Sequence, residues 1–272
     1  MRKRLNKILR KGYGSGIPDV HAESLDQGIE RARNEFPHIR VVRLTCCGEI
    51  YFFKRVLSSK NKEEGPTSPT DTQLLDTEAK NLSWLREIGV PVPEIIARDS
   101  QFLVLSDRGF DLRQIFFSKD YDPEYGIKVC FEAGRALAGL HIKGISLGRG
   151  RPKDFCWGHN AISFIDFEMS PQEFDAETNG AANLWTFVFH LFRDFAIVNR
   201  DGYKEAQSFL SGYLENAHPA PLAAMKAAGC WAKQQRWRAL HFKLVAVVAP
   251  LHMSSRYRAM SPALRMFKHF HS

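Results

Sequence analysis

Four charged side chains occupy positions where chemistry on a phosphate group would need them. Lys54 lies in an apolar run that predicts a strand, and Glu78 lies near the start of a predicted helix. Asp154 and Asp166 flank a predicted hairpin. A strand lysine can neutralise nucleotide phosphates, and a helix carboxylate can hold that lysine in place. Two carboxylates at the ends of one hairpin offer the oxygen ligands that Mg²⁺ prefers.

Each of these residues also has an ordinary structural interpretation. Lys54 alone would be a solvent-facing lysine of an edge strand, Glu78 a surface acid, and Asp166 a turn-forming residue after a strand. The order of the elements favours the phosphate chemistry. A β-rich first part is followed by a helix, a strand, a turn at 106–109 and then a helical part with a charged loop and a hairpin. This is the order of a protein kinase-like fold, so we expect a two-lobed α+β protein of that kind.

The elements expected in the first lobe follow from hydrophobic periodicity and turn residues. Ser24 is a candidate helix cap, and Gly89 ends the longer helix. The polar segment 58–72 is expected to be a loop. The predicted elements are a helix at 23–36, a hairpin of strands at 39–45 and 50–56, a helix at 73–88 and a strand at 102–105.

The pattern changes to helices after Gly109. Two helices are expected at 111–117 and 124–142, then a loop at 147–154 rich in Gly, Arg and Pro, then a hairpin of 155–157 and 162–165. The remainder is expected to be mostly helical. The resulting domains are a basic N-terminal segment at 1–22, an N-lobe at 23–105 and a helical C-lobe at 106–272 with a basic tail.

Several motifs resemble bacterial lipopolysaccharide core kinases, the heptose and Kdo kinase group. The helix from Glu78 and the Gly-Val-Pro-Val-Pro-Glu sequence after it are similar to that family over 78–98. Tyr51-Phe-Phe-Lys, Leu140-His-Ile-Lys-Gly and Ile165-Asp-Phe-Glu look like its strand, pre-loop and metal-binding motifs. The resemblance covers about 39–195. It implies ATP- and Mg²⁺-dependent phosphorylation of a sugar in a lipid-linked glycan.

In this interpretation Lys54 holds the nucleotide phosphates and Glu78 orients Lys54. Asp154 and Asp166 hold Mg²⁺ and act in catalysis. Kinase catalytic loops carry His-x-Asp, whereas this loop has Leu147-Gly-Arg149 at that place. It resembles a kinase-like subgroup with His-Gly-Arg-Pro-x-x-Lys-Asp, which also lacks the Asp base. Asn183 stands where an anchoring Asp is common.

The altered loop leaves two interpretations of its cations. Arg149 or Lys153 would stabilise charge on the transferring phosphoryl group, since a loose transition state asks little of a base. Alternatively Arg149, Arg151 and Lys153 form a solvated basic loop. The second functional hypothesis is therefore a catalytically weak or inactive pseudokinase that serves as a lipid- or protein-binding scaffold. A small-molecule kinase is a third hypothesis, which the basic C-terminal part disfavours.

Charge is distributed unevenly over the 272 residues. Residues 1–12 carry six cations and no acid, and 216–272 carry nine cations and no acid, although the net charge is only +8. Both ends are therefore adapted to an anionic partner. An anionic membrane surface is favoured because apolar residues interleave with cations in the tail: Tyr257, Met260, Leu264, Phe267 and Phe270 alternate with Arg256, Arg258, Arg265 and Lys268. A solvated tail without a partner remains open, and no nucleic acid is expected because no recognition motif is present.

The composition is that of a globular protein, with 44% hydrophobic and 25% charged residues. No apolar run is long enough to span a bilayer, and no apolar segment of a secretory signal follows the basic start. The five scattered cysteines indicate reduced thiols. We therefore expect a cytoplasmic protein that associates peripherally with the inner face of the membrane.

Overall fold

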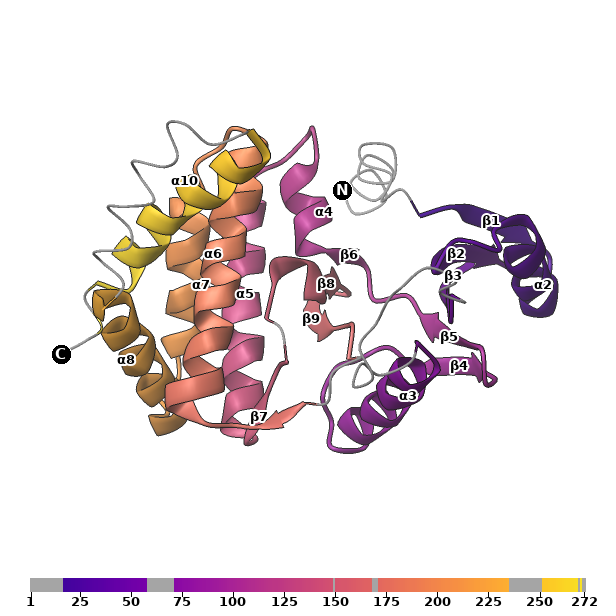
Figure 1. Cartoon of the computed structure of the whole chain (residues 1–272), viewed down its shortest axis with the longest axis horizontal. Helices are drawn as coiled ribbons and strands as arrows, with labels where there is room; N and C mark the ends of the chain where they lie inside the picture. The colour runs from indigo at the N-terminus through magenta and orange to yellow at the C-terminus, as the bar shows by residue number, and fades with distance from the viewer. Residues whose placement is uncertain are drawn as a thin grey trace. The chain divides into compact units, whose positions relative to one another are not determined.

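The computed structural model describes residues 17–57, 71–148, 150–167, 171–234, 251–268 and 270. They form a mixed α/β protein of two compact units (Figure 1). The sheet unit consists of the described residues of Gly14–Gly109 and Ser163–Ser170. The helical unit consists of those of Phe110–Ile162 and Pro171–Ser272. The first boundary lies close to the one predicted near residue 105, but the segment after the second hairpin belongs to the sheet unit.

The sheet unit is built on a five-stranded sheet in the order β1-β2-β3-β5-β4. The predicted hairpin is confirmed: β2 and β3 pair antiparallel around Cys47 and Gly48. Both turn residues have positive φ, 52° and 83°, as a two-residue hairpin turn requires. The strands are β1 Asp19–Ala22, β2 Val41–Cys46, β3 Glu49–Arg55, β4 Ile95–Arg98 and β5 Phe102–Ser106.

Strand β1 corrects the predicted boundary of the N-terminal segment. Residues 1–22 were expected to lie outside the first lobe, but β1 pairs in parallel with β2. Helix α2, Leu25–Glu35, connects the two strands, and Ser24 caps it as predicted by accepting from the backbone of Gln27. A strand of four residues with one buried apolar side chain has too weak an alternation to be found from sequence.

The predicted helix at 73–88 is observed as α3, Asp71–Glu87. Its apolar face buries Leu75, Leu82 and Leu85. Gly89 follows with φ of 74°, the left-handed conformation that ends many helices. The buried face also carries Glu78, so this helix positions a carboxylate inside the sheet unit.

The helical unit contains α5, α6 and α7 side by side, with α8 and α10 beside them (Figure 1). The two helices predicted after Gly109 are confirmed. The helices are α4 Leu112–Phe117, α5 Pro123–Ile142, α6 Ala181–Ile197, α7 Tyr203–Leu214, α8 Pro219–Gln234 and α10 Leu251–Met266. A short π-helical turn, η2 Ala176–Gly180, precedes α6.

Short elements of the helical unit carry the charged loop. Strand β7, Ile145–Ser146, pairs with β10, Gln172–Glu173. The 3₁₀ turn η1, Pro152–Asp154, leads into the predicted hairpin of β8, Phe155–Gly158, and β9, Ala161–Phe164. Strand β6, Phe110–Asp111, pairs with β8. The hairpin turn uses two residues of positive φ, His159 and Asn160.

Helices α5 and α7 approach closely because each has a glycine that lies against the backbone of the other helix. A Cβ at Gly134 would overlap the carbonyl oxygen of Phe209, and one at Gly212 would overlap that of Phe131. We expect Gly134→Ala to lower the free energy of unfolding by about 1–3 kcal/mol, since the helices must separate. The control is Gly139→Ala on the same helix, where nothing lies within 4 Å. Urea unfolding should show no loss for this control, and equal destabilisation of both variants would contradict the predicted clash.

Helix α10 corrects part of the interpretation of the C-terminal tail. Leu264 and Phe267, assigned to a membrane-facing surface, are 7% and 0% exposed and belong to the core. Helix α10 packs on α6, and the Phe267 ring lies 6.0 Å from that of Trp185. The apolar spacing was detected correctly, but these two side chains pack inside the helical unit and do not form a membrane-facing surface. The side chains of 251–258, including Arg256, Tyr257 and Arg258, lie outside the described part.

Among the helices of the described ranges, none combines the length and the apolar character needed to cross a membrane.

Candidate functional site

Lys54, Glu78 and Asp166 meet in the sheet unit. The Lys54 ammonium lies 2.6 Å from Glu78 Oε2 and donates to Asp166 Oδ1 at 3.3 Å. The Lys54 and Glu78 side chains are 10% and 2% exposed, whereas Asp166 is 30% exposed. The structure thus brings together three of the residues predicted from sequence. Glu78 is a deep partner of the lysine, and Asp166 is a partner that solvent reaches.

The sheet fixes the position of the lysine. Strand β3 lies between β2 and β5, and Lys54 pairs with Val41 on one side and Leu103 on the other. Its neighbour Phe53 packs into the core against Phe102 at 5.1 Å between ring centroids. Because side chains alternate along a strand, Lys54 points to the opposite face. Lys54 therefore is not the edge-strand residue of the alternative interpretation.

Backbone contacts hold Asp166 in place after β9. The Phe164 N–H donates to the Pro91 carbonyl at 2.9 Å, and Asn81 Nδ2 donates to the Phe167 carbonyl at 2.9 Å. Asp166 itself has φ of 70°, which is uncommon for a residue with a side chain. Such a conformation persists only where the surroundings enforce it, and it is frequent at functional sites.

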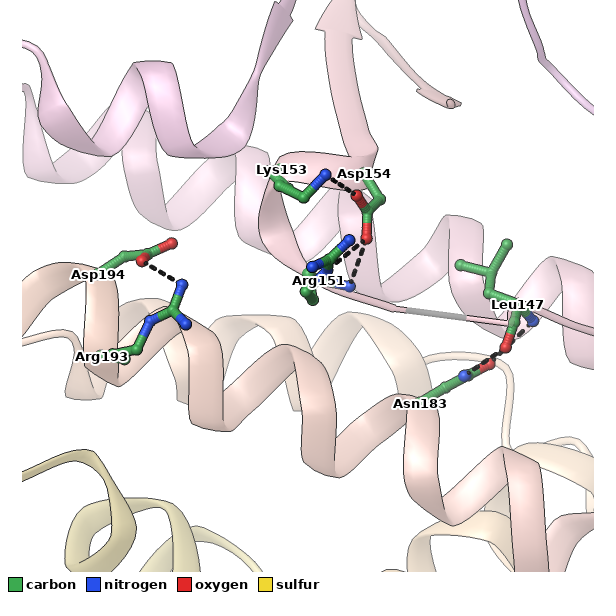
Figure 2. A network of polar contacts seen from close by, with 7 residues as sticks. All are labelled: Leu147, Arg151, Lys153, Asp154, Asn183, Arg193 and Asp194. Atoms are coloured by element: carbon green, nitrogen blue, oxygen red, sulfur yellow. Dashed lines mark hydrogen bonds and ion pairs between the residues drawn. The ribbon is translucent and has the colours of Figure 1, made fainter. Parts of the chain in front are cut away.

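Asp154 lies in the helical unit, in η1, and its side chain is 4% exposed. Its Oδ2 accepts from the backbone N–H and Nε of Arg151 at 3.2 and 3.1 Å. Its Oδ1 lies 3.0 Å from the ammonium of Lys153 (Figure 2). Both oxygens of this predicted Mg²⁺ ligand therefore face cations. The two predicted metal ligands also belong to different units, Asp154 to the helical and Asp166 to the sheet unit.

Of the two predicted catalytic cations, Lys153 and Arg149, the structure describes only Lys153. Lys153 is 40% exposed and reaches Asp154 from the solvent side. Arg149 lies outside the described residues. Within the described part of either unit, no three His, Cys, Asp or Glu side chains lie close enough together to hold a metal ion by themselves.

Asn183, at the start of α6, anchors the segment that leads into this loop. Its Oδ1 accepts from the Leu147 N–H at 3.0 Å and from Ser146 Oγ at 2.9 Å, and its Nδ2 donates to the Leu147 carbonyl at 2.8 Å (Figure 2). His141 Nε2 lies 3.2 Å from the same Oδ1, and Tyr213 Oη lies 2.5 Å from His141 Nδ1. With Oδ1 as acceptor, His141 carries its proton on Nε2 and accepts from Tyr213 on Nδ1.

His141 predicts a dependence of stability on pH. Burial lowers its pKa from 6.5 to about 4, so the folded protein keeps the imidazole neutral while the unfolded chain binds a proton below pH 6.5. The unfolded state then binds more protons, and the stability falls as the pH is lowered from 6.5 towards 4, by about 3 kcal/mol at most. His141→Gln should remove this loss. The measurement is the stability difference between wild type and variant at several pH values, in which other titrating groups cancel. A difference independent of pH would contradict the prediction.

Asp111 is a functional candidate that the sequence analysis missed. Burial raises its pKa to about 6, although Lys153 and Arg113 oppose the shift. It caps α4 by accepting from the Gln114 N–H at 2.8 Å, and Gln114 Oε1 accepts in return from the Asp111 N–H. An Asp three residues before Gln is a helix-start signal in the sequence. The sequence could not show that Lys153 lies near Asp111, because this proximity depends on the packing of η1 against α4.

Comparison with known proteins gives little further information. No family model matches the chain. An uncharacterized protein of Haemophilus influenzae is similar to it, with 29% identity over 100 residues. The matched part is 37% of this chain and 41% of that relative. The chain thus spans less than half the length of the relative, to which no activity is assigned.

Proposed function

We propose that the protein is an ATP- and Mg²⁺-dependent phosphotransferase with a two-lobed kinase-like fold. The observation that carries this proposal is the buried Lys54–Glu78 pair with Asp166 beside it. A lysine held by a buried carboxylate has a fixed position, and a second, accessible carboxylate lies within 3.3 Å of it. These are the charges needed to hold nucleotide phosphates together with their metal ion.

A purely structural interpretation explains the pair less well. Burying two charges costs desolvation free energy, and apolar residues of similar size would join β3 and α3 as stably or more stably. The pair is therefore weak evidence for stability and better evidence for a site that needs a positioned cation. The positive φ of Asp166, whose carboxylate lies 3.3 Å from the Lys54 ammonium, supports the same interpretation, because such conformations are frequent at functional sites.

The residues fit the implied groups unequally. Lys54 fits a phosphate, because its ammonium can exchange Asp166 for another anion while Glu78 retains it. Asp166 fits Mg²⁺, which commonly takes one or two carboxylates and completes its shell with waters and substrate phosphates. Asp154 fits the metal less well, because Arg151 and Lys153 hold both of its oxygens. When bound, the metal would neutralise phosphate charge, and Lys153 would stabilise the transferring phosphoryl group.

The acceptor and the location of the reaction belong to this proposal. The resemblance to lipopolysaccharide core kinases supports a sugar hydroxyl in a lipid-linked glycan as the acceptor. The resemblance also supports a reaction at the inner face of the membrane, to which the basic ends of the chain would be attracted. Arg149 would act with Lys153 in stabilising charge on the transferring group.

One observation favours the second candidate, a pseudokinase that binds a lipid or protein partner and transfers nothing. Both carboxylate oxygens of Asp154 are held by Arg151 and Lys153. In a scaffold this ion-pair network would keep the loop closed, and Asp154 would have no metal to bind. The loop sequence, which lacks the His-x-Asp base, agrees with this candidate.

Calorimetric titration of ATP, with and without Mg²⁺, distinguishes the two candidates. We expect binding to the wild type that strengthens with Mg²⁺. For Asp166→Asn we expect the affinity to fall by about tenfold or more. The matched control is Asp76→Asn, which removes an exposed carboxylate of α3 that pairs with Arg98. The control should bind as the wild type does. Absence of ATP binding to the wild type would contradict the proposed phosphotransferase activity and favour the scaffold candidate.

A further inference from the structure

Charged side chains gather where α4, η1 and α6 pack together in the helical unit. The cluster contains Asp154 with its partners Arg151 and Lys153, described above. Residues of the flanking helices, which the proposed function does not use, complete it. They are Arg113 on α4 and Arg193 and Asp194 on α6.

Asp194 is a second buried acid of this cluster, with a side chain 2% exposed. Its Oδ1 accepts from Arg193 at 3.1 Å and lies 3.6 Å from Arg113 Nε. Burial raises the pKa of Asp194, and Arg193, Arg113 and Arg151 all oppose that rise. Asp154 with Arg151 and Lys153 lies at η1, and Asp194 with Arg193 lies on α6, which packs against η1 (Figure 2).

Asp111 closes the cluster on the side of α4. Lys153 and Arg113 are the charged groups that lower its pKa against the effect of burial. Arg151 and Lys153 pair with Asp154, and Arg113 and Arg193 pair with Asp194. With Asp111, the cluster therefore contains four cations and three acids. Even with all three acids ionised, one positive charge is in excess.

Two of the three acids are more deeply buried than the cations that pair with them. Asp154 and Asp194 have side chains 4% and 2% exposed. The cations are more accessible: Arg151 and Arg193 are 22% and 21% exposed, and Lys153 and Arg113 are 40% and 41% exposed. Asp154 and Asp194 therefore lie beneath the cations that they bind, and an anion that arrives from solvent meets guanidinium and ammonium groups first. Guanidinium groups fixed in this way suit a phosphate, which they bind through two parallel N–H donors.

We propose that this cluster of the helical unit, bounded by Arg113, Lys153 and Arg193, binds a phosphate group of the acceptor substrate. The acceptor would then be an already phosphorylated molecule. Its identification as an acceptor rests on the proposed function, whereas the phosphate site itself does not. A free phosphate and the phosphate of the nucleotide share this chemistry, so the test must separate the cluster from Lys54.

The test is calorimetric titration of inorganic pyrophosphate into the full-length protein at low salt. We expect binding to the wild type, and an affinity about tenfold lower for Arg113→Gln and for Arg193→Gln. The control is Arg135→Gln, an arginine of α5 that is paired with Glu132 and Glu215 and exposed to 47%. It should bind pyrophosphate as the wild type does. Equal affinity of all four proteins would overturn the proposal.

Two further variants keep the outcome interpretable. Arg193→Gln removes a partner of a buried acid and can impair folding, so Arg193→Gln/Asp194→Asn is measured beside it, with thermal unfolding as the check.

Lys54→Met separates the phosphate cluster from the nucleotide site: we expect this variant to lose ATP binding and to retain pyrophosphate binding. If Lys54→Met alone abolishes pyrophosphate binding, the phosphate belongs to the nucleotide site and the proposal is wrong. If ATP fails to bind the wild type while pyrophosphate binds the cluster, the phosphotransferase fails and the phosphate site stands.

Discussion

Replacing Lys54 with Met is expected to abolish ATP binding and to lower the free energy of unfolding by about 3–5 kcal/mol. The affinity is lost because the ammonium is the group that would meet the nucleotide phosphates. The stability is lost because Glu78 is 2% exposed and would remain in the interior without the cation 2.6 Å away. Removing one member of a buried pair leaves a charge that is neither hydrated nor balanced. Calorimetry with ATP and urea unfolding measure the two effects.

The double variant Lys54→Met/Glu78→Leu separates these effects. It replaces both charges by apolar side chains, so most of the lost stability should return while ATP still fails to bind. Lys54→Met with wild-type stability would show that the pair is not buried as described. Retained Mg²⁺-dependent ATP binding in the double variant would remove Lys54 from the nucleotide site.

Asn183→Ala is expected to lower the free energy of unfolding by about 3 kcal/mol or more. It removes the common partner of His141, Ser146 and Leu147, and Asn183, His141 and Ser146 are each at most 3% exposed. Each buried donor or acceptor left without a partner costs about 1–3 kcal/mol. The same change should release the segment that leads to Asp154. Hydrogen exchange should then become faster at the Leu147 amide, which donates to Asn183.

Two variants test whether the anchor itself is responsible. Asn183→Asp keeps an acceptor for all three donors, and in its protonated form it can also donate to the Leu147 carbonyl. We therefore expect a smaller loss than with Ala at a pH low enough to protonate this carboxyl. Asn179→Ala, four residues earlier, removes the more exposed hydrogen bonds of Asn179 and should change stability little. Unchanged exchange at Leu147 in Asn183→Ala would contradict the anchoring role.

Local chemistry determined much of the secondary structure. The hairpin of β2 and β3 follows from two β-branched and aromatic runs around Cys47-Gly48, and α2 begins at the predicted cap Ser24. The longer helices α3 and α5 have enough residues for an apolar face to be unmistakable. Strands β1 and β4 were not predicted, since four residues with little alternation carry no period. The predicted fold is confirmed only as a mixed α/β protein.

The sequence also identified Lys54 and Glu78 as a candidate pair, because a strand lysine and a helix acid in that order are typical of phosphate-binding folds. Only the tertiary structure decided their burial and brought Asp166 to the same ammonium across 112 residues. Packing likewise assigned Leu264 and Phe267 of α10 to the core, since hydrophobic periodicity does not distinguish a membrane from a neighbouring helix. The partners of Asp154 and Asn183 depend on which backbone segments the fold places against each other. Local propensity extends over a few residues, whereas burial and long-range charge pairs are properties of the whole fold.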